Sequence, residues 1–220
     1  MQPQPYFPEA EELPGNAAGL DYDVRLGFIR DVIDRFTLSV LVVAAATVSL
    51  LNWAPDYARD LTRSALAALG ALLVASTLRK IRLGGESDRL SIWVLPFILG
   101  TMARLAAALT LAGVRLELIP IAVLAVWLYR MMCGRDFSFL GLFTLGCLPL
   151  GVGWAILRPG WWGLLWGVMT LAYVSYDLAA LLQRRRLNEA GLAVVDLYRD
   201  VLNFISYTFR VIHHWRNFRI

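Results

Sequence analysis

The sequence predicts an all-α membrane protein built as a seven-transmembrane-helix bundle. Hydrophobic residues make up 58% of the 220 residues and charged residues only 17%, whereas a soluble domain has roughly 45–50% and 25%. The mean hydropathy is +0.57. Seven spans of about 20 residues would use most of the chain, so we expect one domain and no separate soluble unit.

Seven apolar segments lie between polar, proline or glycine breaks. They cover residues 36–53, 61–78, 92–111, 116–129, 139–157, 161–182 and 192–212. Only the fourth is short: at 1.5 Å per residue it extends about 21 Å, less than the roughly 30 Å hydrocarbon core. Tryptophans such as Trp53, Trp161 and Trp162 stand near segment ends, as they do in the aromatic belts of membrane proteins.

The two ends of the chain are polar. Residues 1–35 contain many prolines and acidic residues, which predicts a disordered cytosolic tail rather than a signal peptide. Residues 36–212 would form the transmembrane domain, and residues 213–220 a short basic C-terminal tail. Lipid is the expected partner, and the net charge of +4 is assigned to membrane orientation rather than to nucleic-acid binding.

Orientation follows from the basic residues that flank the segments. The N-terminal tail and the loops after the second, fourth and sixth segments hold twelve Lys and Arg, whereas the other side holds six. The positive-inside rule therefore places the N-terminus in the cytosol. The C-terminus lies across the membrane if all seven segments span it, but a last segment that re-enters or returns to the cytosol remains open.

The last segment carries a stripe of polar side chains. Asp196, Asp200, Asn203, Tyr207 and Arg210 follow one another at intervals of four, three, four and three residues, so they share one helical face. A charge at the bilayer centre costs roughly 3 kcal/mol on insertion scales. We therefore expect this face to lie inside a bundle or against water and to carry the function.

Asp177, near the end of the sixth segment, lies at a depth similar to that of Asp200. Consecutive antiparallel helices joined by a short loop are normally neighbours, so the two carboxylates could face each other. Two carboxylates in a poorly hydrated site cannot both ionise at low cost, and once ionised they are ligands for a hard cation such as Ca²⁺. This pair predicts a pH-gated cation path with Asp177 and Asp200 as gate and tentative Ca²⁺ ligands.

The competing interpretation is that these aspartates pair with arginines and only hold the bundle together. Arg104, in the middle of the third segment, is the best-placed counter-ion, and Arg199 and Arg210 are further candidates. Asp196 lies nearer the rim, where water could solvate it. We do not expect an enzyme, because no span contains a histidine and no metalloprotease or nucleophile-elbow motif occurs. No cofactor is expected beyond Ca²⁺ as a permeant or bound ion.

Three stretches resemble the Bax inhibitor family, the seven-helix proteins with the transmembrane Bax inhibitor motif. Residues 25–32 (RLGFIRDV) are similar to its "R-x-x-F-I-R-K-V-Y", and residues 135–141 (RDFSFLG) to the stretch that enters its fifth span. Tyr176-Asp177 followed by residues 193–204 (AVVDLYRDVLNF) is the most specific match, to "A-x-x-L-Y-x-D-x-x-N-x-F". The order and spacing agree over about 190 residues.

The resemblance implies a central last helix surrounded by six others. It also implies a calcium leak gated by aspartates that match Asp177 and Asp200, with roles in calcium homeostasis and suppression of cell death. It places the protein in an endoplasmic reticulum or Golgi-type membrane if the source is eukaryotic or viral, and in the plasma membrane if it is bacterial.

The departures from the family pattern indicate a divergent member. Asp31 replaces a basic residue, Arg199 stands where an apolar residue is usual, and the family's latch arginine in the second span has no assigned counterpart. A viral relative could diverge in this way while keeping the fold. The alternative function is thus a non-conducting membrane protein that binds apoptosis- or trafficking-related membrane proteins.

Overall fold

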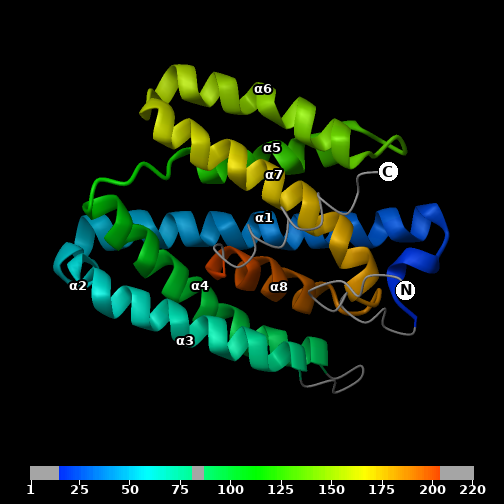
Figure 1. The fold of residues 1–220 in the computed structure, drawn as a ribbon, viewed down its shortest axis with the longest axis horizontal. Helices are drawn as coiled ribbons and strands as arrows, with labels where there is room; N and C mark the ends of the chain where they lie inside the picture. Colours follow the sequence, from blue (N-terminus) through cyan, green and yellow to red (C-terminus); the bar gives the residue numbers. More distant parts are fainter. Residues whose placement is uncertain (1–14, 81–86, 204–220) are drawn as a thin grey trace, which may run out of the picture.

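The computed structural model describes residues 15–80 and 87–203, which form a bundle of long helices (Figure 1). A 3₁₀ turn, Ala17–Gly19, precedes the first helix, and a short helix, α2 (Pro55–Arg59), follows it. The long helices are α1 (Tyr22–Trp53), α3 (Leu61–Lys80), α4 (Ser87–Leu111), α5 (Leu118–Met132), α6 (Phe139–Leu157) and α7 (Gly160–Arg184). The last described helix, α8, covers Ala190–Leu202.

These helices make the chain an integral, multi-pass helical membrane protein. Within the described residues, five helices are long and apolar enough to cross a membrane: α1, α3, α4, α6 and α7. Helix α5 is apolar but has only 15 residues, or about 22 Å, as expected for the short fourth segment. Because the described part of α8 has 13 residues, the count of seven spans remains a prediction.

The predicted disordered tail of residues 1–35 is wrong in its second half, because α1 begins at Tyr22. Residues 22–35 have apolar side chains at helical spacing, and Leu26, Ile29 and Ile33 are buried. Burial of this face stabilises the helix beyond the apolar segment itself. Residues 1–14 and the predicted C-terminal tail, 213–220, lie outside the described residues.

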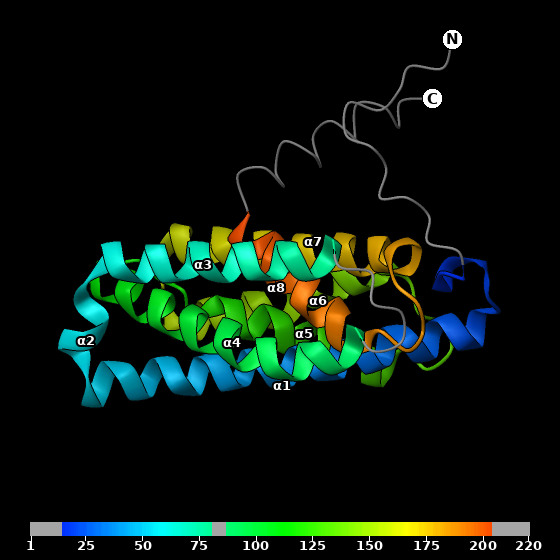
Figure 2. The ribbon, with the colours of Figure 1, turned by 90° about the horizontal axis from the view of Figure 1, so that it is seen from below.

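The two ends of the bundle differ in which elements meet there. At one end, called the Arg184 end here, α1 begins and α5 and α7 finish (Figures 1 and 2). Tyr22 donates a hydrogen bond to the carbonyl of Arg135, at 2.6 Å, so the start of α1 holds the α5–α6 turn. The turns after α5 and α7, which carry Arg135 and Arg185, therefore share this end with the start of α1. Its assignment to the cytosol remains a prediction.

Asp34 ties α1 to α5 near the same end. Its carboxylate accepts hydrogen bonds from Trp127 Nε1 at 3.1 Å and from Arg130 Nη2 at 2.5 Å. The side chains of Arg130 and Asp34 are partly exposed. This is a polar contact between two helices at the edge of the apolar core.

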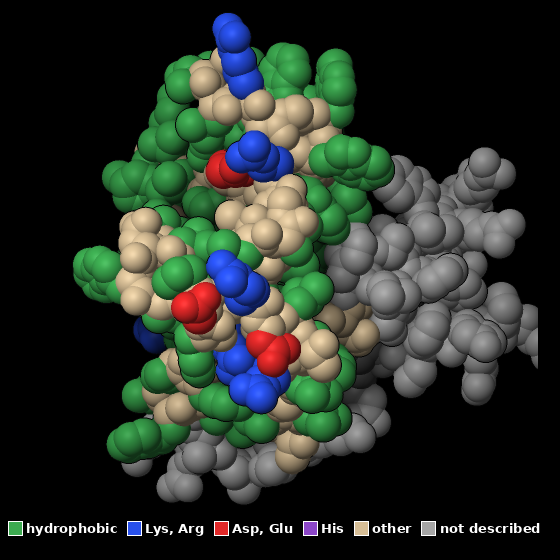
Figure 3. All heavy atoms as spheres, turned by 90° about the vertical axis from the view of Figure 1, so that its left-hand side faces the viewer, with side chains coloured by type: hydrophobic (Ala, Val, Ile, Leu, Met, Phe, Trp, Pro, Cys, Tyr) green, Lys and Arg blue, Asp and Glu red, His purple; other side chains and the backbone are tan. Residues whose placement is uncertain are grey.

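At the opposite end, called the Trp53 end, α1, α4 and α6 finish. Figure 3 shows basic and acidic side chains lying beside one another among hydrophobic ones on this face. Trp53, Trp161 and Trp162 are each more than 70% exposed, which suits interfacial anchors. Beneath this face, α5, α6 and α7 pack closely: a Cβ on Gly167 of α7 would lie 2.9 Å from a methyl of Leu150 in α6.

Candidate functional site

Helix α8 lies inside the bundle, where it contacts α1, α3, α4 and α7 (Figures 1 and 2). Every residue from Ala190 to Asp200 is buried, including charged residues that water would otherwise solvate. Such a helix can be stable only if its polar side chains find partners inside the protein. The described part of the predicted polar stripe therefore faces protein.

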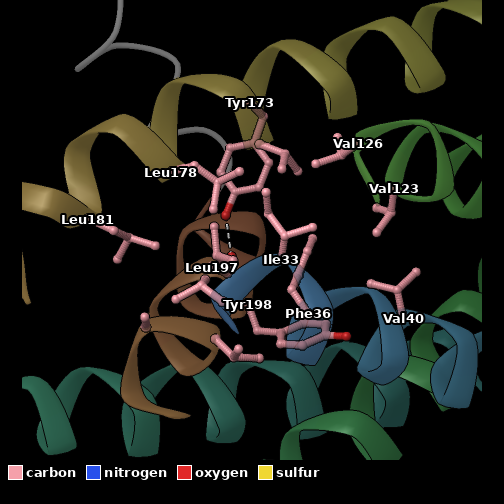
Figure 4. Close-up of a cluster of buried hydrophobic side chains, with 14 of the residues drawn as sticks. Ile33, Phe36, Val40, Val123, Val126, Tyr173, Leu178, Leu181, Leu197 and Tyr198 are labelled. Atoms are coloured by element: carbon pink, nitrogen blue, oxygen red, sulfur yellow. Dashed lines mark hydrogen bonds between the residues drawn. The ribbon is translucent and has the colours of Figure 1, made fainter. Parts of the chain in front are cut away.

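Two tyrosines fix α8 in place. Tyr198 packs its ring against Phe36 of α1, with the ring centroids 5.5 Å apart, and its hydroxyl lies 2.9 Å from Ser39 Oγ. Tyr173 of α7 donates a hydrogen bond to the carbonyl of Leu197 (Figure 4). These contacts set both the rotation and the depth of α8 against its neighbours.

Asp177 of α7 and Asp200 of α8 converge on one arginine. Arg184 Nη1 lies 3.3 Å from Asp177 Oδ1 and 3.6 Å from Asp200 Oδ2. Both aspartate side chains are 0% exposed, and that of Arg184 is 17% exposed. The structure thus brings the two predicted carboxylates together with a guanidinium between them.

Arg199 is a second cation at this pair. Its Nε donates to Asp200 Oδ1 at 3.0 Å, and its Nη2 contacts the same oxygen. One oxygen on each aspartate, Asp177 Oδ2 and Asp200 Oδ2, is buried without a hydrogen bond. Buried carboxylate oxygens normally have such partners, so the pair has unused capacity to accept a proton, a water or a cation.

Arg185 pairs with two further carboxylates beside this pair, those of Asp196 and Glu189. Its guanidinium lies 2.7 Å from Asp196 Oδ2 and 3.7 Å from Glu189 Oε2. Burial lowers the pKa of Arg185, but Asp196 and Glu189 outweigh this effect and raise the pKa above its usual value. The side chain therefore stays charged. Asp196 is 2% exposed, so the expectation that water solvates it is wrong: Arg185 replaces that water.

These side chains form one charged group, named the α7–α8 cluster here. Its members are Asp177, Arg184, Arg185, Glu189, Asp196, Arg199 and Asp200. Arg184 is the last residue of α7, whereas Arg185 has an extended backbone (φ −134°, ψ 151°). This change of conformation lets two consecutive arginines serve different carboxylates.

Comparison with known proteins gives the cluster a family context. No protein-family model and no solved structure matches the chain. Three proteins of Arabidopsis thaliana match most of it. Protein LIFEGUARD 3 is 27% identical over 211 residues, covering 86% of this chain and 85% of its own length. Protein LIFEGUARD 4 is 26% identical, covering 82% of each chain, and Protein LIFEGUARD 2 is 27% identical, covering 92% of this chain and 90% of its own.

The LIFEGUARD proteins are Bax inhibitor family members, and the similarity extends over nearly the whole chain. The chain is similar to these proteins over nearly its whole length, as a divergent member of the Bax inhibitor family would be. This similarity agrees with the resemblance to the Bax inhibitor family described from the sequence.

Other predicted site residues lie elsewhere. Arg104 does not join the aspartates: its guanidinium lies 4.3 Å from the ring centroid of Tyr57 in α2, towards the Trp53 end. The physical reason is depth, because Arg104 is about 25 Å along α4 from its start at Ser87, towards the opposite end of the bundle from Arg184. Asn203 follows α8 as its C-terminal cap residue. Tyr207 and Arg210 lie outside the described residues.

Sequence reasoning missed Arg184, Arg185 and Glu189: the two arginines entered it only in the count of basic loop residues, and Glu189 did not enter it. A signal for Arg184 was present: it follows Asp177 by seven residues, which is two helical turns, so both lie on one face. No comparable spacing indicates Arg185, because its partner Asp196 lies across the turn. Among the described residues, no three His, Cys, Asp or Glu side chains gather as metal ligands.

Proposed function

We propose that this Bax-inhibitor-like membrane protein regulates cell death and intracellular calcium as a pH-sensitive, calcium-permeable leak gated by Asp177 and Asp200. One observation supports the gate: two fully buried carboxylates from consecutive helices share a single guanidinium, that of Arg184. The family relationship supports the role in cell death. In the arrangement described, the arginines neutralise the carboxylates and the path is closed.

Opening requires that Arg184 leave the pair while both carboxylates are ionised. Asp177 Oδ2 and Asp200 Oδ2, which accept no hydrogen bond, would then supply oxygen ligands to a passing Ca²⁺, a hard cation that prefers carboxylates. Protonation of either aspartate removes negative charge and weakens that interaction. Calcium flux should therefore fall as the pH decreases.

Calcium uptake into liposomes that contain the purified protein tests this proposal. The wild type is compared with Asp177→Asn, Asp200→Asn and Arg184→Gln between about pH 6 and pH 8. We expect each aspartate variant to change the size or the pH dependence of the flux, and Arg184→Gln to increase it. Arg115→Gln is the matched control, because Arg115 pairs with Glu117 on the exposed Trp53 end. Equal flux in all variants would exclude the pair as the gate.

A second function has its own support in the same cluster. Each aspartate of the α7–α8 cluster lies within ion-pair distance of an arginine, as expected if the charges only hold α7 and α8 together. The protein would then be a non-conducting partner of apoptosis- or trafficking-related membrane proteins. Liposomes with folded wild-type protein and no calcium flux above that of empty liposomes would favour this function.

The proposed orientation places the Arg184 end in the cytosol, in an intracellular membrane if the source is eukaryotic. The test is labelling of single cysteines in sealed vesicles, in a background without Cys133 and Cys147. Arg135→Cys on the α5–α6 turn and Arg158→Cys on the α6–α7 turn should react from opposite sides. Labelling of both from the same side would contradict it.

A further inference from the structure

A short segment before α1 lies directly against the turn that carries the two arginines. The 3₁₀ turn Ala17–Gly19 is capped by Asn16, whose side chain accepts a hydrogen bond from the Ala18 N–H at 3.1 Å. Ala17 is 0% exposed. Its N–H donates to the carbonyl of Arg185 at 3.0 Å. The segment contacts both α1 and α7, and residues 16–20 are called the N-terminal strap here.

The strap is hydrogen-bonded to Arg185, the residue whose extended backbone lets Arg184 and Arg185 pair with different carboxylates. Arg185 is the first residue after α7, and its N–H still bonds the carbonyl of Leu181. Its own carbonyl has left the helical hydrogen-bond pattern and accepts the Ala17 N–H instead. A residue held at both its N–H and its carbonyl has a fixed backbone, which sets the points from which the Arg184 and Arg185 side chains leave the chain.

We propose that the N-terminal strap is a regulatory element: docked, it holds the α7–α8 turn so that Arg184 stays between Asp177 and Asp200, and released, it frees Arg184. The first step, that the strap holds the α7–α8 turn, rests on the contacts of Ala17 and Arg185 alone. The consequence for calcium flux rests on the proposed function. Motion of the strap would in this way be transmitted to the buried Asp177–Asp200 pair through its hydrogen bond with the carbonyl of Arg185.

Ala17→Pro removes the hydrogen bond from the Ala17 N–H to the Arg185 carbonyl and suits the backbone conformation at this position. Proline lacks the N–H, it is favoured at the first position of a helical turn, and it requires an extended preceding residue. Asn16 already meets that requirement, with φ −62° and ψ 165°. Ala17→Leu is a second, independent variant, because a larger side chain cannot fit at a fully buried position without lifting the strap.

Ala18→Leu is the matched control, since the same side chain is added one residue further on at a half-buried position. Hydrogen–deuterium exchange of the amides of Arg186 and Glu189 reports the turn, because their N–H groups are bonded within it. We expect both Ala17 variants to exchange about tenfold faster than wild type at these amides, the size of effect that loss of one hydrogen bond can produce. Ala18→Leu should match wild type.

The same proteins are then tested for calcium uptake into liposomes, after circular dichroism shows that each is folded. Faster exchange with increased flux in both Ala17 variants supports the proposal. Unchanged exchange in folded Ala17→Pro overturns it. Faster exchange with unchanged flux, in a wild type that does conduct, overturns the regulatory role. If the wild type passes no calcium, the proposed function fails, and the exchange result alone decides whether the strap holds the turn.

Discussion

The two ends of the bundle contain the same kinds of ion pair in opposite surroundings. At the Trp53 end, Asp56–Arg59 and Asp60–Arg63 join residues three apart, and their side chains are 41–89% exposed. At the Arg184 end, the arginine that joins α7 to α8 meets two aspartates that are 0% exposed. The first set joins neighbours in the sequence and is exposed to water, whereas the second connects two helices and is buried.

This difference in exposure indicates which charged residues the stability of the fold depends on. An exposed ion pair adds little to the free energy of unfolding, because water solvates both partners almost as well when they are apart. A buried ion pair also adds little compared with apolar side chains in the same place, but removing one partner leaves the other charge buried without a counter-ion. The α7–α8 cluster is therefore where single substitutions should have large effects, and four substitutions can test the comparison.

The largest effect is expected from Asp200→Ala. This change leaves Arg199 and Arg184 without the carboxylate between them, in a site that excludes water, and should destabilise the protein by about 3 kcal/mol or more. The measurement is the thermal unfolding midpoint of the detergent-solubilised protein, which should fall clearly. A midpoint equal to that of wild type would show that the cluster is better hydrated than its burial indicates.

Arg185→Gln should have the next largest effect. It removes the guanidinium that pairs with the buried Asp196 and Glu189, although the amide can still donate hydrogen bonds, so a loss of about 2 kcal/mol is expected. The thermal midpoint measures it, and Arg186→Gln is the neighbouring control, since no ion pair of Arg186 is among those of the described residues. Equal thermal midpoints for Arg185→Gln and Arg186→Gln would show that the buried ion pairs of Arg185 do not contribute to stability.

A smaller effect is expected from Asp34→Asn, which weakens a link of intermediate exposure between α1 and α5. The amide keeps an acceptor for Trp127 but loses the charge that attracts Arg130. We expect a loss of about 1 kcal/mol, and the added salt that screens exposed pairs should reduce the difference from wild type. Thermal unfolding at low and high salt checks both points.

Arg59→Gln should have the smallest effect, less than about 0.5 kcal/mol. The Arg59–Asp56 pair lies on the exposed surface of the Trp53 end, so water replaces the lost partner. The thermal midpoint should stay within error of that of wild type. A loss as large as that of Arg185→Gln would remove the distinction between the two ends.

Much of the fold could be predicted from the sequence, because hydropathy acts along the chain. Apolar runs bounded by polar breaks predicted the helices from α3 to α7, and the length of the fourth segment predicted a short α5. The start of α1 was misplaced, since the buried face of residues 22–35 alternates with charges and does not resemble a span. An amphipathic helix of this kind becomes stable only against a partner surface.

The candidate site was only half predictable for a related reason. Depth along a helix follows from residue counting, so Asp177 and Asp200 could be placed at similar levels. Which cation stands beside them depends on how each helix is rotated and on side-chain reach. Arg104 was chosen as the counter-ion, but it lies too far along α4 and contacts Tyr57, and Arg184 was overlooked.

The local order of residues was enough to predict a helical membrane protein with two acidic side chains at similar depth. The tertiary structure was needed to show that Arg184 stands between those carboxylates, that Arg185 pairs with Asp196, and that the Ala17 N–H bonds the carbonyl of Arg185. The contacts of Arg184 with Asp200, of Arg185 with Asp196 and of Ala17 with Arg185 join residues from different elements. They form only when packing has fixed the rotation of each helix and excluded the water that would compete for the charges.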